Sequence, residues 1–161
     1  MNLNKLIYLC LIILTTIITV NKNFANNIEE MNDNLIRPEY LKAGDTIAIV
    51  APSGILNDHQ NYIDKAKNLL ESWNLNVLIG ENIYNNYGHF SGTDKERAQD
   101  FQRALDDKTI SAIWCARGGY GAMRIIDNLD YSEYIKSPKW IIGYSDITAI
   151  HNELNIIGSE S

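Results

Sequence analysis

Short apolar runs alternate along the chain with segments in which apolar residues recur at helical spacing. The runs are residues 46–51 (TIAIVA), 76–80 (NVLIG), 110–116 (ISAIWCA) and 139–143 (KWIIG). Runs that are this short and this continuously apolar are typical of strands buried on both faces, as in a parallel sheet. The alternation therefore predicts an α/β fold in which helices cover a parallel sheet, with right-handed crossovers.

The segments between the runs carry helical periodicity and helix-start signals. Helices are predicted over residues 57–73, from 93 to about 105, over 121–128, and from about 146 to 157. Asp58 is positioned to cap the first helix. Thr93 and Glu96 have the spacing of a capping box, in which a hydroxyl and a carboxylate each satisfy a free backbone NH group. Residues 81–92 have no period and are predicted to form a surface loop.

The first 25 residues differ from the rest because they hold Lys5 and Lys22 but no carboxylate. Residues 6–20 are uncharged and would rise about 22 Å as a helix, short of the roughly 30 Å hydrocarbon core of a bilayer. A positive start before a short apolar segment is typical of a secretory signal peptide. We therefore expect residues 1–25 to export the chain to the periplasm or cell envelope, with an uncleaved membrane anchor as the alternative.

The rest of the chain is acidic and carries a single cysteine. Residues 26–36 are polar and Asn-rich and are predicted to be a flexible leader into one domain over residues 37–161. The chain of 161 residues has 14 Lys and Arg against 20 Asp and Glu, and this acidic excess argues against a nucleic-acid-binding surface. Cys10 would leave with a cleaved signal, so Cys115 would remain alone and the fold would depend on its core rather than on a disulfide.

Three unusual turns come directly after three of the predicted strands, at residues 52–54, 117–121 and 143–146. In parallel α/β sheets, ligands bind beyond the carboxyl ends of the strands. All three turns should meet at that edge, and their convergence marks it as the candidate site.

The turn at residues 143–146 resembles a nucleophile elbow, in which a serine sits in a sharp strand-to-helix bend with its hydroxyl exposed. Ser145 is placed correctly for this role. The usual second glycine, two residues after the serine, is replaced by Ile147. A second interpretation, that Ser145 caps the last helix, is equally compatible with the pattern.

The glycine-rich turn permits close backbone approach. Gly118 and Gly119 could offer NH groups as an oxyanion hole or a phosphate cradle, or could simply form a tight turn. Position 124 is Arg124 where a dinucleotide fingerprint would require glycine, so a nucleotide site is disfavoured. Arg117 could bind a substrate carboxylate or form a structural salt bridge. Ser53 could line the site or stabilise its turn.

The remaining reactive residue types give weaker signals. His151 lies six residues after Ser145, about 240° further around a helix, and should not reach that serine as a base. Cys115 falls inside an apolar run and is predicted to be a buried, inert thiol. No His, Cys or carboxylate pair has the spacing of a metal site, so a metal is not expected.

Four motifs, in this order and spacing, resemble the amino-terminal half of the LD-carboxypeptidase family of serine peptidases, the muramoyltetrapeptide carboxypeptidases. They are GDTIAIVAPSG (44–54), SGTDKERAQDFQRAL (91–105), AIWCARGGYGAMRII (112–126) and IIGYSDITAIH (141–151). The resemblance implies a Rossmann-like nucleophile domain, similar in class to that of class I glutamine amidotransferases. It implies hydrolysis of the L,D-amide before the terminal D-alanine of a murein tetrapeptide, without a cofactor.

The resemblance also implies residue roles. Ser145 would be the nucleophile, and the oxyanion hole would combine the Asp146 NH with that of Gly118 or Gly119. Arg117, Tyr120 and Ser53 are the candidate substrate-binding residues beside them. In the family a histidine and a glutamate from a carboxy-terminal domain activate the serine, and nothing after Ser145 in this sequence replaces them. The isolated chain is therefore expected to be nearly inactive.

Several alternatives are also compatible with the sequence. The partner expected is a murein peptide, together with a second copy or a separately encoded carboxy-terminal half. Apolar surface should be exposed where such a half would dock. The chain could instead be a non-catalytic murein-peptide-binding module or the remnant of a truncated gene. Family members that recycle murein peptides commonly act in the cytoplasm, which is the alternative address.

Overall fold

The computed structural model describes residues 13–25, 35–56 and 60–161. The chain divides into two units, residues 1–35 and 36–161. In the first unit, residues 13–25 are helical and solvent-exposed. No helix in the described part of the chain is both long enough and apolar enough to span a bilayer. Asp58, the predicted helix cap, lies outside the described residues.

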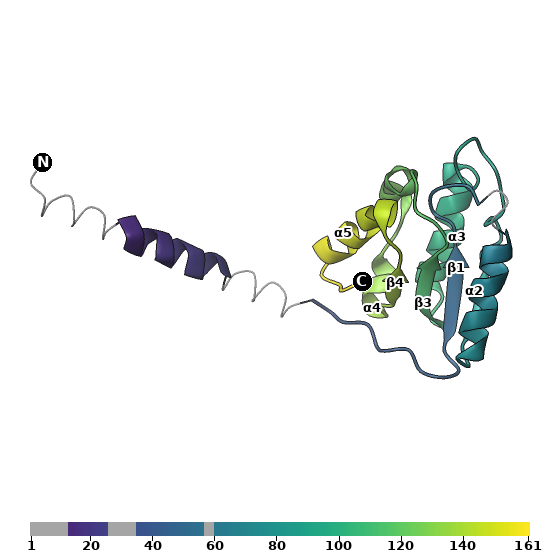
Figure 1. Cartoon of the computed structure of the whole chain (residues 1–161), viewed down its shortest axis with the longest axis horizontal. Helices are drawn as coiled ribbons and strands as arrows, with labels where there is room; N and C mark the ends of the chain where they lie inside the picture. The colour runs from purple at the N-terminus through teal and green to yellow at the C-terminus, as the bar shows by residue number, and fades with distance from the viewer. Residues whose placement is uncertain (1–12, 26–34, 57–59) are drawn as a thin grey trace, which may run out of the picture. The chain divides into compact units, whose positions relative to one another are not determined.

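The second unit is built on a four-stranded parallel sheet with the order β2-β1-β3-β4 (Figure 1). The strands are β1 (Thr46–Val50), β2 (Asn76–Ile79), β3 (Ile110–Cys115) and β4 (Trp140–Ile142). All four coincide with the predicted runs, so the parallel α/β fold is confirmed. Strands β1 and β3 are central, and β2 and β4 form the edges.

Helices connect and cover the strands. They are α2 (Gln60–Ser72), α3 (Asp94–Asp106), α4 (Ser132–Lys136) and α5 (Thr148–Ile156), with short 3₁₀ helices η2 (Ala122–Arg124), η3 (Ile126–Asn128) and η4 (Ser145–Ile147). The capping box that begins α3 is confirmed, since Thr93 accepts from the Glu96 NH and the Glu96 carboxylate accepts from the Thr93 NH.

Two predictions of helix type need correction. Residues 121–128 form η2 and η3 rather than one short helix. Helix α4 was not predicted, because its five residues (SEYIK) are too few to display a period. The last helix begins later than expected, since η4 precedes α5 and contains Ser145.

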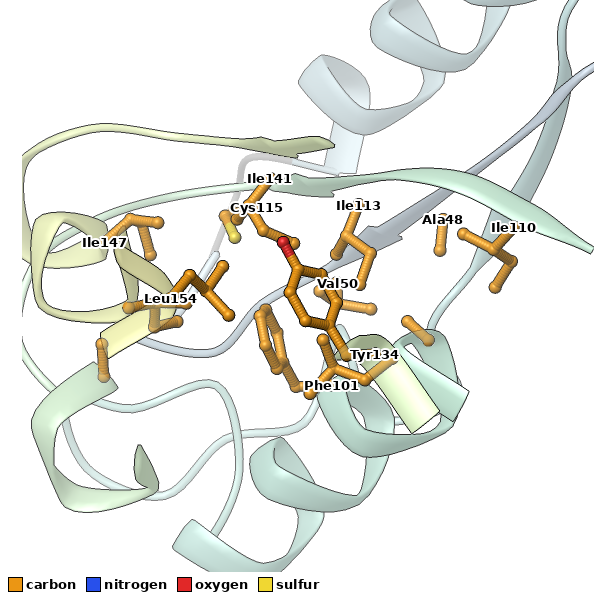
Figure 2. Packing of buried hydrophobic residues seen from close by; sticks show 14 residues of the cluster. Ala48, Val50, Phe101, Ile110, Ile113, Cys115, Tyr134, Ile141, Ile147 and Leu154 are labelled. Carbon is orange, nitrogen blue, oxygen red and sulfur yellow. The ribbon is translucent and has the colours of Figure 1, made fainter. Parts of the chain in front are cut away.

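Alternate residues of β1 point into two separate cores. Ala48 and Val50 pack with Phe101 of α3, Tyr134 of α4 and Leu154 of α5 (Figure 2). The other face holds the second core, in which the β1 side chains and Ala112 of β3 pack with α2 residues; its buried members are Ile47, Ile49, Ala51, Leu56, Ile63, Leu70, Leu75, Ile83 and Ala112. In the described part of the chain, α3, α4 and α5 therefore lie on one face of the sheet and α2 lies on the other.

Candidate functional site

The three predicted turns meet at the carboxyl edge of the sheet. Gly54, after β1, donates its NH to the carbonyl of Gly118, after β3, at 3.2 Å. The Asp146 carboxylate, after β4, accepts from the Ser53 hydroxyl at 2.7 Å and from the Ala122 NH at 2.8 Å. One carboxylate oxygen thus joins the segments that follow β1, β3 and β4, and the predicted convergence is observed.

Ser145 occupies the bend between β4 and the last helix. Its φ of 63° lies in the left-handed region, which disfavours any residue with a Cβ by roughly 1–2 kcal/mol. The residue is exposed, and neither η4 nor α5 has a side-chain cap. The helix-cap interpretation of Ser145 is therefore wrong. An exposed serine in a strained strand-to-helix bend is the geometry of a nucleophile elbow.

Gly143 and Ile147 explain how the bend closes without a second glycine. A Cβ on Gly143 would lie 2.7 Å from an Ile147 methyl carbon, closer than side chains pack. Ile147 itself is fully buried in the core beneath α5. Because Gly143 has no side chain, the Ile147 side chain fits beside it and anchors the bend in the core. The elbow therefore forms without the usual second glycine.

The two oxyanion candidates differ in their distance from the serine. A Cβ on Gly118 would lie 3.4 Å from Ser145 Oγ and 3.1 Å from its Cβ. A Cβ on Gly119 would instead meet Gly54 at 3.4 Å, and Gly119 has a φ of 117°. The backbone of Gly118 therefore lies against the serine, whereas Gly119 supplies the turn's positive φ.

Arg97 is a site-building residue that the sequence interpretation missed. It is 1% exposed, and one guanidinium nitrogen donates to the carbonyls of both Pro52 and Gly121, the latter at 2.9 Å. A second nitrogen binds Asp94. Burial lowers the pKa of Arg97, and the charge of Asp94 opposes that shift. Arg97 therefore clamps the turns after β1 and β3.

A signal for Arg97 was present in the sequence. It precedes Phe101 by four residues and Ala104 by seven, which places it on the apolar face of α3. A charged residue on such a face must have buried partners, because an unpaired buried charge is very costly. The pattern could have identified Arg97 as buried, although not which carbonyls it binds.

Arg117 and Tyr120 lie exposed beside the turn. Arg117 donates to the carbonyl of Ile55, and its guanidinium forms no salt bridge with any residue that the structure describes. Tyr120 is 62% exposed, with its ring 6.0 Å from that of Phe90. The structural salt bridge considered for Arg117 is thus replaced by a bond to backbone.

His151 and Cys115 do not serve the serine. The His151 ring nitrogens contact the Ser161 hydroxyl at 2.7 Å and the Gly143 carbonyl at 3.3 Å. Cys115 is buried, and this burial raises the pKa of its thiol. Within residues 13–25, 35–56 and 60–161, no cluster of three or more His, Cys, Asp or Glu side chains could hold a metal ion.

The fold and the site define a class: a parallel α/β domain with a serine in a strained elbow beside a glycine-rich turn. Residues 47–159 match the model of the LD-carboxypeptidase N-terminal domain, Peptidase_S66. The chain belongs to this family, as the four motifs indicated.

Relatives and solved structures agree with this membership. The chain is 35% identical over 119 residues to a probable murein peptide carboxypeptidase of Bacillus subtilis, covering 74% of this chain and 37% of the relative. It is 32% identical over 106 residues to the murein tetrapeptide carboxypeptidase of Pseudomonas aeruginosa, covering 65% and 34%. The muramoyltetrapeptide carboxypeptidase of Oxalobacter formigenes superposes with a TM-score of 0.61 at 28% identity, covering 71% and 38%.

The chain is also similar to a solved structure of a protein whose name gives it a different role. The structure of the microcin C7 self-immunity protein MccF in complex with aspartyl sulfamoyl adenosine superposes with a TM-score of 0.70 at 30% identity, covering 77% of this chain and 37% of that one. The chain spans about 38% of the length of the first curated relatives it matches.

Proposed function

We propose that this chain supplies the nucleophile domain of a serine LD-carboxypeptidase that removes the terminal D-alanine of murein tetrapeptides. The observation that carries the proposal is Ser145, exposed at a φ of 63° against the backbone of Gly118. Family membership and the murein carboxypeptidases among the relatives support the substrate class.

Each site residue has a role in this proposal. Ser145 Oγ attacks the carbonyl carbon of the L,D-amide and loses its proton to a base. The NH groups of Asp146 and Gly118 stabilise the oxyanion of the tetrahedral intermediate. The intermediate expels D-alanine, whose amine takes the proton, and water then hydrolyses the acyl-enzyme to release a tripeptide.

Substrate orientation is assigned to Arg117 and Tyr120. The exposed guanidinium of Arg117 suits the terminal carboxylate of the peptide, and the exposed Tyr120 ring offers an apolar contact. Ser53 is fully buried, so its hydroxyl positions Asp146 rather than touching substrate.

His151 directs its ring nitrogens away from Ser145, and the family resemblance assigns the base to the carboxy-terminal part that relatives carry. In the family this base is a histidine oriented by a glutamate. Removing triad members typically lowers turnover by several orders of magnitude, so the isolated chain should hydrolyse tetrapeptide very slowly.

A reconstitution experiment tests the proposal. The chain is incubated with murein tetrapeptide, alone and fused to the carboxy-terminal part of the Bacillus subtilis relative, and released D-alanine is quantified by mass spectrometry. Turnover should require the fusion and should vanish in Ser145→Ala. Ser72→Ala, which removes an exposed serine hydroxyl at the end of α2, is the matched control and should retain activity.

Two outcomes would contradict parts of the proposal. Fast turnover by the isolated chain, lost in Ser145→Ala, would show that the base lies within these residues. A folded fusion that binds tetrapeptide without cleaving it would favour the alternative of a non-catalytic binding module. In an active fusion, Arg117→Ala should raise KM more than it lowers kcat.

Export is proposed separately, on the charge pattern of residues 1–25. Expression in a bacterial host followed by mass measurement of the recovered chain tests it. Loss of about 25 residues supports a cleaved signal, whereas an intact amino terminus in the cytoplasm contradicts it.

A further inference from the structure

The end of the loop between β2 and α3 lies beside the turn that follows β1. The Ile55 NH donates to the His89 carbonyl at 3.0 Å, and the Ser91 NH donates to the Ser53 carbonyl at 3.1 Å. Phe90 lies between these two paired residues of the loop. The loop predicted from the sequence is therefore tied at its end to the framework of the candidate site.

The Phe90 ring packs against the glycine-rich turn. A Cβ on Gly121 would lie 3.1 Å from Phe90 Cδ1, so the ring lies directly on the Gly121 backbone. The ring centroids of Phe90 and Tyr120 are 6.0 Å apart, within the range of an aromatic pair. The guanidinium groups of Arg97 and Arg124 also face the Phe90 ring, at 5.0 and 5.2 Å from its centroid, as in cation–π interactions.

Asp94 allows two arginines of like charge to share one aromatic ring. Its carboxylate accepts from Arg97 and also from Arg124, which donates twice, at 2.9 and 2.6 Å. Asp94, and more weakly Tyr120, raise the pKa of Arg124, so that this guanidinium remains charged at neutral pH. The Phe90 ring therefore lies between two cations whose positions are fixed by a shared carboxylate.

The two ends of the glycine-rich turn are held by different groups. At the first end, the Gly118 carbonyl accepts from the Gly54 NH at 3.2 Å, and Gly118 lies against Ser145. At the other end, Tyr120 packs against the Phe90 ring. A change confined to the Phe90 side chain should therefore alter the end that carries Tyr120 and leave the end beside the serine in place.

We propose that Phe90 is a positioning residue, which holds Tyr120 in the orientation that binds the peptide substrate. The role of Tyr120 as a peptide contact belongs to the proposed function, on which this inference rests. Tyr120 is 62% exposed, and exposed side chains ordinarily change rotamer freely. Ordering such a side chain on binding costs free energy, which a neighbouring group that already holds it reduces. Phe90 therefore raises the affinity for peptide by acting through Tyr120.

Fluorine NMR of the 161-residue chain, labelled with 3-fluorotyrosine, tests the contact without any need for catalysis. Tyr120→Phe identifies the Tyr120 resonance. Phe90→Leu keeps an apolar side chain but removes the ring, so the Tyr120 resonance should narrow and move toward the position of free fluorotyrosine. Tyr87→Leu is the matched control, because Tyr87 is 61% exposed in the same loop, and it should leave the Tyr120 resonance unchanged. An unchanged Tyr120 resonance in Phe90→Leu would overturn the proposal.

Kinetics of the fusion to the carboxy-terminal part of the Bacillus subtilis relative measure the effect on peptide affinity. Phe90→Leu should raise the KM for tetrapeptide about fivefold and change kcat by less than about twofold, because the end of the turn beside Ser145 keeps its own support. Phe90→Tyr retains the ring and should restore the KM of the natural fusion, and Tyr87→Leu should not alter it. An unchanged KM in Phe90→Leu, or a fall in kcat as large as the rise in KM, would overturn the proposal.

The two measurements separate a failure of this inference from a failure of the proposed function. If no fusion cleaves tetrapeptide, the natural one included, the proposed function is contradicted and the Tyr120 resonance alone decides the role of Phe90. If the natural fusion cleaves tetrapeptide and Phe90→Leu has the same KM, the proposed function stands and the role of Phe90 is overturned. Phe90→Met, which also lacks a ring, is the second variant should Phe90→Leu fail to fold.

Discussion

A buried cation lies at each end of helix α3, and the two cations bind different kinds of partner. At the carboxyl edge of the sheet, Arg97 binds Asp94 and the carbonyls of Pro52 and Gly121. At the amino edge, Lys139 donates to the carbonyls of Ala104 and Asp107, at 3.0 and 2.7 Å. Arg97 ties together two loops of the candidate site, whereas Lys139 satisfies the free carbonyls at the end of a helix.

The difference indicates that Arg97 supports the geometry of the candidate site, whereas Lys139 supports only the stability of the fold. A planar guanidinium can bridge several acceptors at once, which suits the junction of two turns and a helix. An ammonium is a compact charge that suits the carbonyl end of a helix dipole. Replacing Arg97 should therefore disturb the site, and replacing Lys139 should disturb only the fold.

The largest expected effect is that of Arg97→Met. The change leaves the carbonyls of Pro52 and Gly121 without their donor and removes a buried charge pair, at a cost of about 3–5 kcal/mol in the free energy of unfolding. Arg103→Met is the matched control, because Arg103 lies on the same helix and pairs with Glu81 at the surface.

Urea unfolding measures both variants. The control should cost at most about 1 kcal/mol, as exposed ion pairs do. Equal losses in the two variants would contradict the clamp. Arg97→Lys keeps the positive charge but lacks the planar guanidinium. It should recover part of the stability but not tetrapeptide cleavage by the fusion.

Burial of Lys139 predicts that the free energy of unfolding depends on pH. Burial lowers the pKa of Lys139 to about 8, against 10.5 for an unperturbed lysine. Between these pH values the folded state holds fewer protons than the unfolded state, so the free energy of unfolding should rise with pH, by up to about 3 kcal/mol. Lys139→Met has no amine at this position, so its free energy of unfolding should lack this rise with pH.

The measurement is the difference in unfolding free energy between the natural chain and Lys139→Met from pH 7.5 to 10.5. Lys136→Met is the control, since Lys136 is exposed and its hydrogen bond with Glu133 raises its pKa. The difference for Lys136→Met should stay flat across this window. A flat difference for Lys139→Met as well would show that its amine is charged in the folded state throughout.

The sequence predicts the fold and the position of the candidate serine from different kinds of pattern. The strands were predicted from apolar runs, and α3 from its capping box, because both are local patterns. The roles of Gly118 and Gly119 could not be separated, since a glycine pattern does not say which backbone lies against Ser145. The Asp146 carboxylate contacts with Ser53 and Ala122 join segments far apart in the chain, so no local pattern predicts them.

The smallest expected effect concerns backbone strain at the two edges. Ser145 at the carboxyl edge and Asn74 at the amino edge both have positive φ, 63° and 60°. Asparagine adopts this conformation readily, whereas serine is strained in it. Glycine relieves the strain but loses more chain entropy, so Ser145→Gly should stabilise the fold by about 0.5–1 kcal/mol and Asn74→Gly by almost nothing.

Ser145→Ala separates the backbone from the hydroxyl in this comparison. Alanine keeps the Cβ and hence the strain, so its stability should match that of the natural chain while cleavage by the fusion is lost. If Ser145→Gly were no more stable than Ser145→Ala in urea, the bend would not be strained. In that case the positive φ of Ser145 would not be evidence for a strained nucleophile elbow.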